Sequence, residues 1–112
     1  MTDGSVTQIT AAEVTALVDA GAAFIDVRER HETCAGQAPG VTCMPLQSFE
    51  VSAVPSGLAL VLICRSGRRS DAVAHALAEM GFTTYNVVGG MAAWAAAGLP
   101  VVAEDGTAGF VL

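Results

Sequence analysis

The chain has 112 residues, 53% of them hydrophobic and 14% charged, and a formal net charge of −6. This length suits a single ordinary core, so we expect residues 1–112 to form one domain, and the acidic balance disfavours nucleic acid and anionic membranes as partners. No apolar run approaches the roughly 18–20 residues that span a bilayer, and residues 1–5 lack the charged and apolar regions of a signal peptide, which predicts a soluble cytoplasmic protein.

Cysteine usage agrees with that compartment. The chain has three cysteines, Cys34, Cys43 and Cys64. An odd number of cysteines, in a chain without an export signal, indicates reduced thiols rather than a disulfide framework.

The first part of the chain is predicted to form two strands and a helix. We expect a strand at 6–8, an amphipathic helix at 10–20 and a buried strand at 22–27. The helix begins with Thr10 and Glu13, which have the spacing of a capping box, and it ends at Gly21. Its apolar residues recur at i, i+3 and i+4 from Val14 onward, as one face of a helix requires. The segment 22–27 is apolar and partly β-branched, which is typical of a strand covered on both faces.

The middle of the chain is predicted to be mostly irregular. Before the most hydrophobic strand, at 59–63, we expect a charged turn or short helix at 28–32, a loop at 35–45, a short strand at 41–44 within it and a helical turn at 47–51. Glycine and proline residues at four positions indicate the loop. In the charged segment, we expect Arg30 and His31 to lie in solvent.

The most hydrophobic strand leads directly into Cys64-Arg65-Ser66-Gly67-Arg68-Arg69-Ser70, and a helix predicted from Asp71 to Met80 follows. The first N–H groups of a helix have no partner within it, and their dipoles favour negative charge. A cysteine placed there beside arginines loses its proton easily and becomes a nucleophile. The loop has three arginines and no acid, a charge of +3, whereas the other two arginines and eleven acids give −9. We therefore expect the loop to be the active site and to hold a small anion or an anionic intermediate.

The predicted helix at 71–80 shows two faces. Its apolar stripe consists of Ala72, Val73, Ala76, Leu77 and Met80. Asp71, His75 and Glu79 fall on the opposite face. His75 is therefore expected at the surface rather than as the general base of a Cys–His pair, so activation of Cys64 has to come from the helix N-terminus and the arginines.

The chain continues with a strand at 84–88, a turn at Gly89-Gly90 and a short helix at 91–97, whereas residues 101–112 show no usable period. Because strands alternate with helices at a spacing that suits parallel crossovers, we predict the α/β class with a mostly parallel sheet. Ligands of such sheets bind beyond the carboxyl ends of the strands, where we expect Cys64 to lie.

Five segments, taken in order, carry a family resemblance. They are Phe24-Ile25-Asp26-Val27-Arg28-Glu29, Pro39-Gly40-Val41, Met44-Pro45-Leu46, Cys64-Arg65-Ser66-Gly67-Arg68-Arg69-Ser70 and Val88-Gly89-Gly90-Met91-x-x-Trp94. The combination resembles the rhodanese family, and within it a single-domain sulfurtransferase, over residues 8–101, with 102–112 as a tail. The resemblance implies a five-stranded, mostly parallel sheet with helices on both faces.

The resemblance also implies a chemistry and a site. Cys64 matches the nucleophile that takes the outer sulfur of a small anionic donor such as thiosulfate and passes it, as a persulfide, to cyanide, a thiol or a protein thiol. The loop residues that match donor binding and the cradle of the persulfide are Arg65, Ser66, Gly67, Arg68 and Arg69, and the residues that match supporting roles are Asp26, Arg28, Ser70 and Gly90. We expect Arg28 in an ion pair, and Gly90 at a point where a second loop approaches closely. No metal or organic cofactor is required.

The chain departs from the family pattern at places away from Cys64. Gln37-Ala38-Pro39-Gly40 stands where the family usually has His-Ile-Pro-Gly, and Thr33 stands where an aromatic residue is common, which affects local packing or the choice of partner. Cys34 and Cys43 are unusual, and they are either small, partly buried apolar residues or a resolving thiol for Cys64.

Two other functions stay open. A cysteine phosphatase or arsenate reductase has an arginine six residues after its cysteine, where this chain has Ser70. The shorter loop suits a single sulfur atom better than a phosphate. A module that carries sulfur to a dedicated partner, or senses sulfide or redox state, with little free turnover, is also compatible with Cys64.

Overall fold

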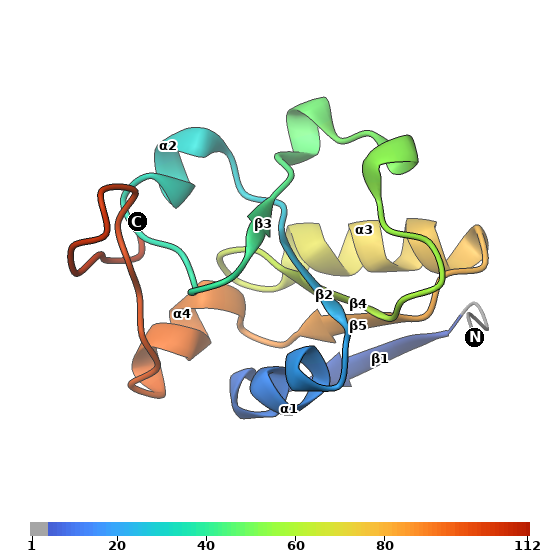
Figure 1. Cartoon of the computed structure of the whole chain (residues 1–112), viewed down its shortest axis with the longest axis horizontal. Helices are drawn as coiled ribbons and strands as arrows, with labels where there is room; N and C mark the ends of the chain where they lie inside the picture. The colour runs from blue at the N-terminus through green and yellow to red at the C-terminus, as the bar shows by residue number, and fades with distance from the viewer. Residues whose placement is uncertain (1–4) are drawn as a thin grey trace.

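The computed structural model describes residues 5–112, which form a five-stranded parallel sheet with helices on both faces (Figure 1). The strands are β1 (Val6–Ile9), β2 (Ala23–Asp26), β3 (Thr42–Cys43), β4 (Leu60–Ile63) and β5 (Thr84–Val87). The helices are α1 (Val14–Asp19), α2 (Arg30–Thr33), α3 (Arg68–Glu79) and α4 (Gly90–Ala96), and short 3-10 turns cover Ala11–Glu13, Leu46–Ser48 and Val51–Ala53. The predicted class and sheet are confirmed. Residues 1–4, at which we expect no signal peptide, lie outside the described part.

The order of the strands in the sheet is β1-β5-β4-β2-β3, and every neighbouring pair is parallel. Strand β4 lies at the centre, and all four of its residues are fully buried. This position explains why β4 is apolar at every residue rather than at alternate ones. Since all strands are parallel, their carboxyl ends meet at one edge of the sheet, and Cys64 follows β4 at that edge.

Alternate residues of β4 belong to two separate cores. Leu60 and Leu62 lie in the core beneath α3, whereas Val61 and Ile63 lie in the core on the opposite face, beneath α1 and α4 (Figure 1). The same alternation places Cys64 in the α3 core. Its side chain is therefore directed toward the helix that follows it in the chain.

Helix α3 begins at Arg68, three residues before the predicted start at Asp71. Gly67 precedes the helix with a φ of 94°, a left-handed conformation that glycine adopts without steric cost. The chain therefore turns into the helix within the loop. As a result, Arg68, Arg69 and Ser70 belong to the first helical turn.

The buried face of α3 also differs from the predicted stripe. Its buried residues are Ser70, Val73, Ala74, Leu77 and Ala78. Ala72, Ala76 and Met80 are exposed, so the prediction is wrong for these three residues. Alanine is too small and too common on both faces to mark one of them, and the polar Ser70, which leads the buried face, does not resemble a core residue.

Residues 101–112 pack as an irregular segment against the loop that contains Gly36 and Gln37. Val102 forms an isolated antiparallel bridge with Gln37. A Cβ on Gly36 would lie only 2.3 Å from the carbonyl oxygen of Phe110, so the two segments are in close contact. Because the segment forms no helix or strand, its apolar residues do not recur at a regular spacing, and the sequence does not predict its structure.

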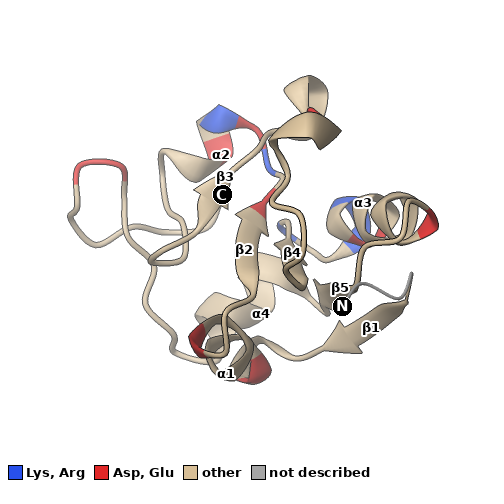
Figure 2. Cartoon of the chain, turned by 45° about the vertical axis from the view of Figure 1, so that its right-hand side comes forward, with Lys and Arg blue, Asp and Glu red and all other residues tan. Residues whose placement is uncertain are grey.

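Charge is distributed unevenly over the fold. Figure 2 shows the basic residues around the end of β2, α2 and the first turn of α3, whereas acidic residues are spread over several elements. No helix within residues 5–112 has the length and apolar character needed to cross a membrane.

Candidate active site

The backbone at Cys64 is held by the start of α4. The Met91 N–H donates to the Cys64 carbonyl oxygen at 2.7 Å, and the next N–H along α4 donates to the Arg65 carbonyl oxygen at 3.0 Å. Gly90 has a φ of 53°, and a Cβ on it would lie 2.2 Å from the Cys64 carbonyl oxygen. The close approach expected at Gly90 is therefore present, and it fixes the point at which the loop leaves β4.

The Cys64 side chain is fully buried, and hydrogen-bond donors surround its Sγ. The Gly67 N–H donates to Sγ at 3.1 Å, and Ser70 Oγ lies 3.3 Å from it. Burial by itself raises the pKa of the thiol, but hydrogen bonds from the Ser70 side chain and from backbone N–H groups of the loop outweigh it. The pKa of Cys64 therefore lies below its ordinary value, and the loop favours a thiolate.

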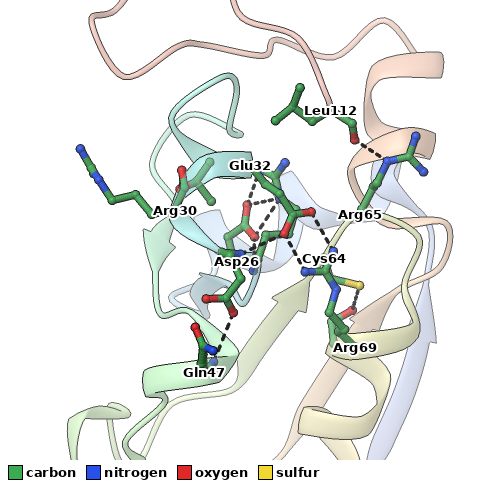
Figure 3. Close-up of polar contacts among 12 residues, drawn as sticks. Asp26, Arg30, Glu32, Gln47, Cys64, Arg65, Arg69 and Leu112 are labelled. Carbon is green, nitrogen blue, oxygen red and sulfur yellow. Dashed lines mark hydrogen bonds and ion pairs between the residues drawn. The ribbon is translucent and has the colours of Figure 1, made fainter.

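Arg69 is bound in an ion pair with Glu32, a residue absent from the predicted site. The two side chains form a bidentate contact, with N–O distances of 2.7 and 2.8 Å (Figure 3). The Arg69 guanidinium lowers the pKa of Glu32 to about 2. This contact ties α2 to the first turn of α3 and leaves Arg69 with little capacity for another anion. The only sequence signal for Glu32 is its position in the charged segment, three residues after Glu29.

The other two loop arginines, Arg65 and Arg68, are exposed. Arg65 donates from Nε to the carbonyl oxygen of Leu112, in the C-terminal segment (Figure 3). Arg68 is exposed at the start of α3. The largest causes of the lowered pKa of Cys64 are a hydroxyl and backbone amides rather than the guanidinium groups alone, although the charge of Arg69 also interacts with Cys64. The loop therefore directs the Gly67 N–H toward Sγ, while Arg65 and Arg68 are exposed.

Asp26 and Arg28 form the expected ion pair, which is fully buried just after β2. Arg28 Nη2 lies 2.8 Å from Asp26 Oδ2 and donates to the Gly36 carbonyl oxygen at 2.7 Å. Among the described side chains, Arg28 Nη1 is the buried polar atom without a hydrogen-bond partner. These contacts join β2 to the loop at Gly36.

Asn86 on β5 is a second residue that the sequence interpretation missed. It is 3% exposed, and its Oδ1 accepts a hydrogen bond from the Ser70 hydroxyl at 2.6 Å. A polar residue inside a buried strand has to find a hydrogen-bond partner. An asparagine inside a predicted buried strand could therefore have indicated a polar contact beneath the loop. It could not have shown that the partner is Ser70.

Cys34 and Cys43 line a separate cavity of about 380 Å³, to which residues 64–70 do not contribute. Cys43 pairs with Asp26, and Asp26 pairs in turn with Ile63, so two interstrand spacings separate Cys43 from the end of β4. Two spacings amount to roughly 10 Å, more than the roughly 4.4–6.8 Å between the Cα atoms of a disulfide. Cys43 therefore does not reach Cys64 as a resolving thiol unless the backbone moves.

The remaining titratable candidate lies outside the site. His75 is 60% exposed on α3, and its Nδ1 lies 3.5 Å from Asp71 Oδ1 one turn earlier, which confirms its predicted surface position. Within residues 5–112, no three His, Cys, Asp or Glu side chains gather in the manner of metal ligands. What the loop offers chemically is a thiolate stabilised by hydrogen bonds, which is a nucleophile.

Comparison with known proteins identifies a family and several similar proteins. The family model for the rhodanese-like domain matches residues 10–97. A sulfurtransferase of Allochromatium vinosum is 34% identical over 86 residues, which cover 74% of this chain and 80% of that protein. YrkF of Bacillus subtilis, which is proposed to be a sulfur carrier protein, is 38% identical over 74 residues, 63% of this chain and 40% of that protein. The crystal structure of a rhodanese-related protein from Thermoplasma volcanium has a TM-score of 0.81 and 28% identity, covering 88% of this chain and 99% of that one.

Proposed function

The chain belongs to the rhodanese-like family of sulfurtransferases, and from this premise we propose that it moves a sulfane sulfur from thiosulfate, or a similar anionic donor, to a thiol through a persulfide on Cys64. The observation that carries the proposal is the set of donors around Sγ, namely the Gly67 N–H at 3.1 Å and the Ser70 hydroxyl at 3.3 Å. We place this chemistry in the cytoplasm, where thiols stay reduced.

The first step is an attack by the Cys64 thiolate on the outer sulfur of thiosulfate. A bond forms between Sγ and that sulfur while the sulfur–sulfur bond of thiosulfate breaks, and sulfite leaves with the electron pair. The negative charge that remains on the outer sulfur of the persulfide is stabilised by N–H groups at the start of α3. Arg65 and Arg68, both exposed, are the cations available to attract the anionic donor.

The second step transfers the outer sulfur to an acceptor. A thiolate, or cyanide in an assay, attacks the outer sulfur, and Sγ leaves as the Cys64 thiolate. The hydrogen bonds that lower the pKa of Cys64 also make its sulfur a better leaving group. The same donors therefore serve both halves of the cycle.

Peptide-resolved mass spectrometry tests the persulfide directly. After incubation of the reduced protein with thiosulfate, we expect a gain of about 32 Da, one sulfur atom, on the peptide that contains Cys64. Cys64→Ser should show no gain, whereas Cys43→Ser should keep it. Absence of the gain in folded wild-type protein with thiosulfate, glutathione persulfide and polysulfide would falsify the proposal.

A sulfur-carrier role is a second candidate, favoured by the likeness to YrkF. The two roles differ in a kinetic assay. A carrier forms one persulfide per chain and stays loaded in the presence of cyanide or small thiols, whereas an enzyme turns over many times.

A further inference from the structure

A continuous chain of polar side chains runs from Cys64 to the surface. Ser70 Oγ lies 3.3 Å from Cys64 Sγ and 2.6 Å from Asn86 Oδ1. The Asn86 amide nitrogen then donates to Gln8 Oε1 at 2.8 Å, and Gln8 Nε2 donates to Asp71 Oδ1 at 2.7 Å. Ser70 and Asn86 are buried, whereas Gln8 lies on β1 at the surface.

The carboxylate at the far end fixes the direction of every hydrogen bond in this chain. An ionised carboxylate only accepts, so Gln8 presents its nitrogen to Asp71 and its oxygen to Asn86. Asn86 in turn presents its nitrogen to that oxygen. The second hydrogen of the same nitrogen is donated to the Gly67 carbonyl oxygen at 3.2 Å. The Asn86 oxygen is therefore held toward Ser70, where it can only accept.

The Ser70 hydroxyl has one hydrogen and two neighbours that compete for it. Asn86 Oδ1 is nearer, at 2.6 Å, than Cys64 Sγ, at 3.3 Å. When Cys64 is a thiol, its own S–H donates to the Ser70 oxygen and both contacts are satisfied. When Cys64 is a thiolate, Sγ needs a donor, and the hydroxyl has to turn away from Asn86 to supply one.

We propose that Asn86 is a positioning residue that holds the Ser70 hydroxyl off Sγ while Cys64 is a thiol or a persulfide, and yields it to Sγ when the thiolate forms. Ser70 keeps its proton throughout, and the thiol proton of Cys64 is released to solvent. Asn86 thus sets how readily Cys64 ionises, by competing for the hydroxyl. The persulfide part rests on the proposed function, whereas the effect on thiol ionisation does not.

Charged groups also lie on the elements around Cys64, and among them Arg69 interacts electrostatically with it. They are Arg65 before α3, Arg68, Arg69 and Asp71 on α3, Asp26 at the end of β2 and Arg28 just after β2. None of them is changed in the variants below. A change in Cys64 ionisation therefore reports on the hydroxyl and its competitor.

The experiment measures the rate of Cys64 alkylation by iodoacetamide against pH, with the Cys64 peptide quantified by mass spectrometry. In Asn86→Leu, the freed hydroxyl donates to Sγ, and we expect the thiolate fraction below neutral pH to rise about threefold to tenfold, the equivalent of one neutral hydrogen bond. Gln8→Ala, at an exposed position, should shift the profile the same way but less, because Asn86 loses one of its two restraints.

A double mutant separates positioning from general structural damage. Ser70→Ala should lower the thiolate fraction, and adding Asn86→Leu to it should change nothing further, since the hydroxyl is gone. A lower thiolate fraction in Asn86→Leu or Gln8→Ala, or an unchanged one in both, overturns the proposal. So does a rise that persists in the Ser70→Ala background. Alkylation requires no sulfur donor, so these outcomes are independent of whether the protein transfers sulfur.

Discussion

Cys64 and Cys43 stand at the same edge of the sheet with opposite properties. Hydrogen bonds from the Ser70 side chain and the loop backbone lower the pKa of Cys64 against the effect of its burial. Desolvation by the surrounding protein and the nearby charge of Asp26 raise the pKa of Cys43, although the residue is exposed. Cys43 ends a two-residue strand that no helix follows directly, whereas Cys64 leads into a glycine turn and α3. The carboxyl edge of a sheet is therefore not sufficient for reactivity, and converging donors make the difference.

The largest expected effect is the difference in sulfur transfer between two variants, Cys64→Ser and Cys43→Ser. Cys64→Ser should abolish sulfur transfer from thiosulfate to cyanide, because a hydroxyl at this position does not accept a sulfane sulfur. Cys43→Ser should retain at least half of the wild-type rate. Comparable losses in both variants would mean that the two cysteines act together, against the comparison drawn above.

The close contact between Gly90 and the Cys64 backbone gives the next largest expected effect, a loss of stability. Gly90→Ala places a Cβ 2.2 Å from the Cys64 carbonyl oxygen at a φ of 53°, and we expect a loss of more than about 2 kcal/mol in the free energy of unfolding, with slower Cys64 alkylation. The matched control is Gly98→Ala, where φ is also positive, at 77°, but the Cβ meets nothing within 4 Å. Urea unfolding measures both, and equal losses would contradict a specific role for the contact.

The pH profiles of alkylation sharpen the comparison further. Since the pKa of Cys64 is lowered and that of Cys43 raised, Cys64 should react at lower pH than Cys43 in the same protein. Ser70→Ala should move the Cys64 profile to higher pH by about 0.5–1 unit and leave the Cys43 profile in place. Peptide-resolved mass spectrometry records both profiles in one sample, and profiles in the reverse order would refute the account of Cys64.

The smallest expected effect concerns the ion pair between Glu32 and Arg69. The pKa of Glu32 is lowered from 4.5 to about 2, so its stabilisation is fully present above about pH 4.5 and is lost as the pH falls toward 2. Glu32→Gln should cost about 1–2 kcal/mol at pH 7 and flatten the pH dependence of stability in that acid range. Thermal unfolding from pH 2 to 7 measures this dependence. The control is Glu79→Gln, at an exposed position on α3, the helix that contains Arg69. An unchanged acid dependence in Glu32→Gln would assign the acid sensitivity to other groups.

Much of the fold follows from local patterns. The buried strands, the capping box of Thr10 and Glu13 and the loop after β4 depend on neighbours within a few residues, and all are found close to their predicted positions. The predicted start of α3 is three residues too late, because the prediction counts Gly67 and the residues after it as loop. In the structure, the left-handed conformation of Gly67 leads directly into the helix. Cys64 was therefore placed correctly after the end of β4, while the first turn of the following helix was not.

Contacts between distant segments were not predictable in the same way. Glu32 meets Arg69 across 37 positions of the chain, and Asn86 meets Ser70 across 16. A single sequence shows that a charge or an amide needs a partner, but the packing of α2, α3 and β5 decides which one it finds. The direction of the loop arginines belongs to the same class, since charge counting does not reveal which way a side chain points.

The hydrogen bonds from α4 to the carbonyl oxygens of Cys64 and Arg65 also set an order of events during synthesis. Residues 64–70 leave the ribosome before α4, which begins at Gly90, whereas a domain generally folds as a unit. The loop is therefore anchored at its base only after α4 has been made and has docked. A nascent chain therefore carries Cys64 without this backbone anchor until Met91, 27 residues later, has been synthesised.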